Sequence, residues 1–210
     1  VLLSQVPPTD VVGSGSTGLD RNTLVKTEES GTTFKANLSY KPNEDSLIYG
    51  QWAEGFRLGS ANFPVSSLCD VNNDGILDGT NTPITSGFDS DTTENFELGT
   101  KLSLMDHRLQ VNAAIYRIDW AGIPVFVFPA GKLPEQETQI CFTGTTVNGG
   151  DARSQGFELE TIYQITENLR ANFGGGYTDA EFSKDNIDAG VVSGNRLPSS
   201  PEYSVNLGLQ

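Results

Sequence analysis

The sequence predicts an all-β fold: an antiparallel up-and-down transmembrane β-barrel segment of about seven strands with long extracellular loops. Apolar and polar residues alternate with period two over segments of about ten residues, which is the strand period. Tight turns and long connections also alternate along the chain. Finally, 36% hydrophobic residues and 23 glycines are too few apolar groups for an ordinary soluble core, but they suffice for a wall with one apolar face.

The clearest element is a β-hairpin from Thr93 to Trp120, whose two arms meet at the turn Met105–Arg108. One face of the hairpin carries the apolar residues of both arms, and polar residues occupy the positions between them. The residues of the apolar face are Phe96, Leu98, Leu102, Leu104, Leu109, Val111, Ala113 and Ile115. A helix would not separate its side chains by odd and even position in this way.

The rest of the chain repeats this unit, after a first segment that predicts a loop. Residues 1–30 are rich in Ser, Gly, Thr and Pro and have no sustained period. Five further strands are expected, over Thr32–Lys41, Ser46–Phe56, Arg153–Ile165, Leu169–Tyr177 and Tyr203–Leu209. In the second of these, Gln51 shares a parity with Leu47 and Tyr49, so the sequence leaves its facing ambiguous.

The connections between these strands predict a direction across a membrane. Tight turns are expected at Pro42–Asp45, Met105–Arg108 and Thr166–Asn168, and long loops at residues 57–92, 121–152 and 181–201. Outer-membrane barrels have short periplasmic turns and long extracellular loops, and a tilted strand of about ten residues crosses the hydrocarbon. We therefore expect the turns in the periplasm and the loops outside the cell.

Charged residues within the strands are expected to point into the barrel lumen. A charge on the lipid face near mid-membrane costs about 2–4 kcal/mol, whereas the lumen is polar. The residues concerned are Glu97, Lys101, Glu158 and Glu160. The pair Glu158 and Glu160 could also be read as glycosidase carboxylates, but lumen polarity explains both without catalysis.

Composition excludes several classes of function. A formal charge of −14 argues against nucleic acid as a partner, because phosphate binding needs clusters of Lys and Arg. No apolar run reaches the 20 or so residues of a spanning helix. His107 is the single histidine and lies in a predicted turn, which removes His-based triads, and no catalytic residue is expected. Strands that pair only with each other would leave two open edges in lipid, so the chain is expected to be a piece of a longer protein.

Two cysteines, Cys69 and Cys141, fall in the two longest predicted loops. Two cysteines in extracellular segments are typical of a disulfide formed in an oxidising compartment. The alternative is two unpaired small residues. The sequence favours a disulfide that ties the two loops together on the outer surface.

An acidic stretch of the first long loop matches most of a calcium-binding loop. Side-chain oxygens of Asp70, Asn72, Asp74 and Asp78, with the backbone carbonyl of Ile76, could surround one calcium ion. Gly75 stands where such loops turn sharply, but Asn81 replaces the bidentate Glu of the twelfth position, so affinity should be weak. The alternative is an acidic loop that is only rich in Asx turns.

Four segments, in this order, resemble the C-terminal barrel of the TonB-dependent outer-membrane receptors. They contain a strand ending in Gly-Phe-Arg, an N-x-E-x-G-x-K strand, an N-x-G-x-A-x-x-x-G-x-E-x-E stretch and an L-P-x-x-P entry to a late strand. These segments are Leu47–Arg57, Glu94–Tyr116, Asn148–Glu160 and Leu197–Ser204. They place residues 1–210 in part of that barrel domain, without its plug domain and final strands.

The resemblance implies a barrel of roughly 22 strands in the outer membrane of a Gram-negative bacterium. It also implies active transport of a scarce nutrient such as a ferric siderophore, with outer-membrane lipid as one partner. The other partners would be the TonB system, reached through the missing plug domain, and a small-molecule ligand: siderophore, cobalamin or glycan. Two other readings remain open, a soluble calcium-dependent β-sandwich that binds a surface and a passive porin.

Overall fold

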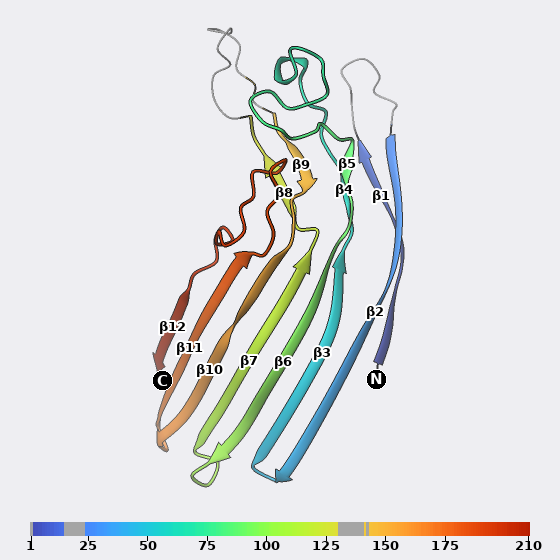
Figure 1. Ribbon diagram of the computed structural model, residues 1–210. Helices are drawn as coiled ribbons and strands as arrows, with labels where there is room; N and C mark the ends of the chain where they lie inside the picture. The colour runs from blue at the N-terminus through green and yellow to red at the C-terminus, as the bar shows by residue number, and fades with distance from the viewer. Residues whose placement is uncertain (1, 15–23, 130–140, 142) are drawn as a thin grey trace.

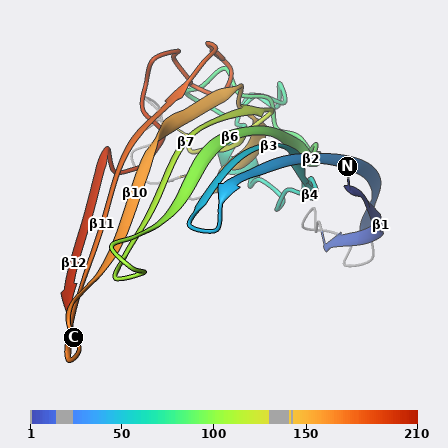
Figure 2. The same ribbon diagram turned by 90° about the horizontal axis from the view of Figure 1, so that it is seen from below.

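One antiparallel sheet dominates the computed structural model, which describes residues 2–14, 24–129, 141 and 143–210 (Figure 1). Its strand order is β1-β2-β3-β6-β7-β10-β11-β12, so every neighbour in the sheet is also the next long strand along the chain. The strands are β1 (Leu2–Ser14), β2 (Leu24–Asn43), β3 (Ser46–Arg57), β6 (Asp91–Leu104), β7 (Leu109–Ala121), β10 (Ala152–Thr166), β11 (Leu169–Phe182) and β12 (Tyr203–Leu209). The sheet curves into an arch when seen from below (Figure 2).

The three predicted tight turns lie together at one end of the sheet and the long loops at the other (Figure 1). The loops contain two small ribbons of their own. Strand β4 (Ser60–Ala61) pairs with β5 (Gly87–Phe88), and β8 (Pro124–Val127) pairs with β9 (Thr145–Asn148). The one other element is a single 3₁₀ turn, η1 (Ser67–Cys69). Within the described ranges, no helix has the length and apolar content to cross a membrane.

The predicted loop over residues 1–30 is wrong for most of its length. Strand β1 pairs with β2 from Leu2 opposite Lys35 to Ser14 opposite Leu24, and the register shifts between Val6 and Thr9. Pro7 and Pro8 lie in that shift, on the edge strand, where missing N–H donors are tolerated. Backbone pairing, rather than alternation of side chains, defines these strands, and residues 1 and 15–23 lie outside the described part.

Several strands extend further towards the loops than alternation indicated. Strand β11 ends at Phe182, beyond the expected end at Tyr177, and it remains paired with β10 as far as Ala152 opposite Phe182. The sequence signal ends earlier because both faces of a strand are polar or mixed once it rises above the apolar band. The predicted extent of about ten residues therefore describes the apolar part only.

Cross-strand register assigns the two faces of the sheet. Gln51 lies opposite Glu97 and Trp52 opposite Phe96, which resolves the ambiguous facing of β3. On the polar face, Asn112 lies between Lys101 and Glu160. We call the polar, concave side the inner face and the apolar side the outer face.

The outer face carries large apolar side chains that the described residues leave uncovered. Leu38 is 79% exposed, Ile115 58% and Leu207 78%. A soluble β-sandwich would bury such a face against a second sheet, and no second sheet packs on it within the described ranges. The buried cluster lies instead among the loops and the strand ends below them. It consists of Ile123, Ala152, Phe182, Ala189 and Val191.

Candidate functional site

The three long loops fold together over one end of the sheet (Figure 1). We call their described parts the loop cap: residues 58–90, residues 122–151 without the undescribed positions, and residues 183–202. The structure contains the predicted disulfide between Cys69 and Cys141, whose Cα atoms lie 5.1 Å apart. It joins the first loop to the second, as the sequence indicated.

A buried asparagine makes a second link between these two loops. Asn62 donates from Nδ2 to Thr145 Oγ1 (3.0 Å) and to the carbonyl of Thr146 (2.8 Å). Its Oδ1 accepts a hydrogen bond from the Thr146 backbone N–H at 3.0 Å. Thr145 is fully buried. One side chain thus stands in for a strand partner of β9, and its loss would leave several buried groups unsatisfied.

Asn148 links all three loops. Its Oδ1 accepts from the backbone N–H of Asp89 at 2.8 Å, and its Nδ2 donates to the carbonyls of Asp89 (3.0 Å) and Gly122 (2.8 Å). From the third loop, Asn186 Nδ2 donates to the Asn148 carbonyl. The hydroxyl of Thr82 also donates to the Asp188 carbonyl. The loop cap is therefore one packed unit rather than three independent loops.

A carboxylate ties together the strand ends beneath the first two loops. Asp91, the first residue of β6, is only 3% exposed. It accepts hydrogen bonds from Nε and Nη2 of Arg57, both at 3.0 Å, and from Nε1 of Trp120. The Arg57 guanidinium also lies 5.5 Å from the centre of the Trp120 ring. The ends of β3, β6 and β7 are thereby fixed to one another.

Asp151 plays the corresponding role for the second and third loops. It accepts hydrogen bonds from the backbone N–H of Gly122 (3.2 Å) and from the ammonium group of Lys184. The Lys184 ammonium, helped by the Gly122 N–H, holds the pKa of the Asp151 carboxyl below its usual range. The carboxylate therefore stays charged at neutral pH and closes the second loop against the third.

The inner face below the cap carries a polar recess of about 210 Å³. Tyr49 donates its hydroxyl hydrogen to Glu97 Oε1 at 2.7 Å, across the β3–β6 pair. The recess brings together the charged residues that the sequence assigned to the lumen. Its lining is Tyr49, Glu97, Lys101, Asn112, Ala113, Ala114, Tyr116, Glu158 and Glu160. Such a surface can bind polar ligands through hydrogen bonds but presents no nucleophile activated by a base.

The predicted calcium-binding residues occupy one folded turn. Asp70 accepts hydrogen bonds from the backbone N–H of Asp74 (2.9 Å) and Gly75 (3.0 Å), and Asp74 accepts one from Ile76 (2.8 Å). Gly75 has φ +80°, which suits glycine.

Two further side chains complete this turn. Asn72 Nδ2 donates to Asp74 Oδ2 at 2.8 Å, and Asp78 accepts from the backbone N–H of Val71 at 3.0 Å. No three His, Cys, Asp or Glu side chains of the described residues are grouped to hold a metal. Each carboxylate oxygen retains further lone pairs, so calcium at this turn stays a prediction.

Sequence reasoning did not find the residues that hold the cap together. Asn62, Asn148 and Asp91 are single polar residues without a recognisable spacing, and their partners lie far away in the chain. Arg57 was noticed only as the end of the Gly-Phe-Arg element. A polar residue at the end of a predicted strand is the one signal that could have drawn attention to Asp91.

Comparisons with known proteins agree with this architecture. A family model described as TonB dependent receptor-like, beta-barrel, matches residues 8–210. Over 196 residues the chain is 26% identical to the probable TonB-dependent siderophore receptor PiuA of Acinetobacter baumannii, covering 87% of this chain and 22% of that protein. It is 32% identical over 120 residues to the metal-pseudopaline receptor CntO of Pseudomonas aeruginosa, covering 57% of this chain and 15% of that one.

A solved structure shows the same fold. The ferric yersiniabactin uptake receptor FyuA of Yersinia pestis superposes with a TM-score of 0.62 at 18% identity, over 89% of this chain and 24% of that one. At this identity the likeness concerns the fold alone. The chain spans about a fifth of the length of the relative from Acinetobacter baumannii, at 22%.

Proposed function

The chain belongs to the TonB-dependent receptor β-barrel family, and on that premise we propose that it is part of an outer-membrane receptor for active uptake of a scarce nutrient. The family consists of transport receptors rather than enzymes, and its members are outer-membrane barrels of Gram-negative bacteria. The observation that carries the proposal is the family match over residues 8–210. The folded loop cap over a polar inner face supports it, because a ligand crossing the wall would meet both.

We propose a metal chelate, and in first place a ferric siderophore, as the nutrient. The names of the two relatives describe a siderophore receptor and a metal-pseudopaline receptor. Both names concern small chelating ligands, which favours this class over cobalamin or glycan. A plug domain elsewhere in the full protein would connect the receptor to the TonB system.

Uptake by cells tests this proposal directly. Cells that carry the full-length gene should accumulate ⁵⁵Fe from a ferric siderophore, and deletion of the gene should abolish that uptake. Deletion of TonB should abolish it equally, because active transport needs the energised partner. Uptake that persists without TonB would favour the passive porin, and a receptor recovered in the soluble fraction would favour the β-sandwich module.

Calcium at Asp70, Asn72, Asp74, Ile76 and Asp78 is a second, independent proposal about the same loop cap. With Asn81 in the twelfth position, we expect binding on the order of 10⁻⁴ to 10⁻³ M, as in extracellular modules. The full-length receptor should then resist protease cleavage near Asp74 in millimolar calcium but not in EDTA.

Two variants make the calcium test specific. Asp74→Ala should remove the protection, whereas Asp106→Ala, an acidic residue of a turn at the opposite end of the sheet, should leave it unchanged. Equal cleavage with and without calcium in the unaltered protein would show that the turn is merely acidic.

A further inference from the structure

A row of charged residues crosses the outer face of the sheet just above its apolar part. These residues are successive register partners on neighbouring strands, so they form one line across β3, β6, β7, β10 and β11. The row consists of Glu54, Glu94, Asp119, Arg153 and Glu181. We call it the outer charged row. The lumen-facing charges have the opposite parity, so lumen polarity does not explain it.

The upper border of the apolar part runs obliquely relative to this row. At β3 and β6 the residues one step below are Trp52 and Phe96, which are apolar. At β7 and β11 the corresponding residues are Arg117 and Asp179, and apolar side chains begin one step lower. The strands lean (Figure 1), and hydrogen-bonded rows run perpendicular to antiparallel strands. A row therefore rises from β3 towards β11, and the border lies at one level relative to the membrane.

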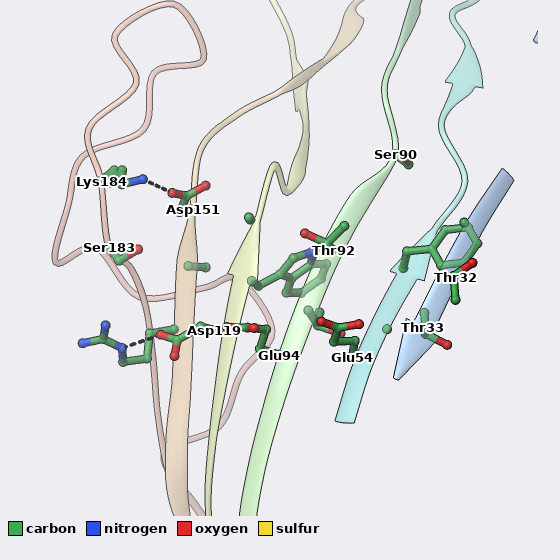
Figure 3. Close-up of a pocket in the computed structure, with 18 residues that line it drawn as sticks. Thr32, Thr33, Glu54, Ser90, Thr92, Glu94, Asp119, Asp151, Ser183 and Lys184 are labelled. Atoms are coloured by element: carbon green, nitrogen blue, oxygen red, sulfur yellow. Dashed lines mark hydrogen bonds and ion pairs between the residues drawn. The ribbon is translucent and has the colours of Figure 1, made fainter. Parts of the chain in front are cut away.

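The outer charged row lines a cavity of about 700 Å³, shown in Figure 3. One end is acidic: Glu54 and Glu94 face each other across the β3–β6 pair. Within the described part of the chain, Glu94 has no hydrogen-bond or ion-pair partner, although like charges opposite each other are unfavourable. The hydroxyl groups of Thr32 and Thr92 and the Phe56 ring line the same end. Carboxylates, hydroxyls and an aromatic ring suit the hydroxyl groups and apolar face of a sugar.

The other end of the cavity is basic. Asp119 accepts hydrogen bonds from Nε and Nη2 of Arg117 (2.8 and 3.0 Å) and from Nε of Arg153 (2.9 Å). It fixes both guanidinium groups on the outer face, where their side chains are 48% and 38% exposed. The two Nη groups of Arg153 donate to no other described residue. Guanidinium nitrogens held in this way suit phosphate oxygens, and Lys184 lies at the same end.

We propose that this cavity binds the phosphorylated sugar headgroup of a membrane glycolipid. The sugar hydroxyls would meet Glu54, Glu94 and Thr92, and the phosphate would meet Arg117 and Arg153. A lipid, rather than a soluble sugar phosphate, fits because the cavity opens on the same face as the apolar side chains and directly above them. The inference rests on the proposed outer-membrane location, since that location puts a headgroup layer at this height.

Lipid binding to the full-length receptor tests the inference. The receptor, purified in detergent and depleted of lipid, is titrated with bisphosphorylated lipid A, with dephosphorylated lipid A and with soluble glucosamine 6-phosphate. Lipid A should bind most tightly. The double variant Arg117→Gln/Arg153→Gln should bind it at least about tenfold more weakly, because charge-assisted hydrogen bonds are lost. Lys101→Gln removes a cation from the inner face and should bind like the unaltered protein.

Three results would overturn the inference. They are equal binding of dephosphorylated lipid A, equally tight binding of glucosamine 6-phosphate, and equal weakening by Lys101→Gln. Heat-resistant migration of each variant in gels checks that the barrel is folded, and Arg153→Lys, which keeps the charge but loses the fork, should give intermediate binding. Siderophore uptake is measured in parallel. Normal uptake without phosphate-dependent lipid binding would refute this inference alone, and the reverse would refute only the proposed transport.

Discussion

Replacing Ile115 by arginine should destabilise the folded receptor by about 2–4 kcal/mol, the cost of a basic side chain near the membrane midplane. Ile115 is 58% exposed on the outer face and lies between Leu98 and Phe157 in neighbouring strands. In lipid an arginine at this position could reach neither water nor a counter-charge. The free energy is measured by reversible denaturant unfolding of the full-length protein in phospholipid vesicles.

Asn112→Arg is the matched control, because Asn112 belongs to the same strand but faces inward between Lys101 and Glu160. It should change stability little. Single cysteines at Asn112 and Asn172 should also react with water-soluble reagents, and those at Val111 and Phe173 with lipid-soluble ones. Similar destabilisation by both arginines, or the opposite labelling pattern, would refute the assignment of the two faces.

Removing the Cys69–Cys141 disulfide with the double variant Cys69→Ser/Cys141→Ser should loosen the loop cap and leave the sheet intact. The bridge closes a sequence separation of 72 residues, for which chain entropy gives about 4 kcal/mol as an upper estimate. The first loop should then be cleaved faster by protease than in the oxidised receptor. The sheet should keep its fold, since its strands are paired by backbone hydrogen bonds far from the bridge.

Limited proteolysis and amide hydrogen exchange of the two proteins check this expectation. The unaltered receptor should show no reactive thiol before reduction. The single variant Asn62→Ala, in which the disulfide is retained, separates the effect of the bridge from that of the buried asparagine: it should weaken protection of β9 without freeing a thiol. Identical cleavage rates in the oxidised receptor and the double variant would show that hydrogen bonds alone hold the cap.

The central part of the fold could be predicted because its signal is local. Alternation with period two identified the strands around residues 93–120, 153–165 and 203–209, and polar clusters identified the three tight turns. The same reasoning failed in residues 2–14 and 24–30, whose strands do not alternate and form because their backbones pair. It also ended β11 at Tyr177, since the apolar signal stops where the strand rises above the apolar part of the outer face.

By itself, then, the sequence determined the fold class, the two faces of most strands, the turn end and the loop end, the family resemblance and one pair of cysteines. These depend on residues that are close neighbours in the chain. Only the tertiary structure decided which residues lie opposite each other, and so the facing of Gln51, the outer charged row, and the contacts of Asn62, Asn148 and Asp91. Such contacts join residues far apart in the chain, and a pattern with a period of two residues contains no information about register between distant strands.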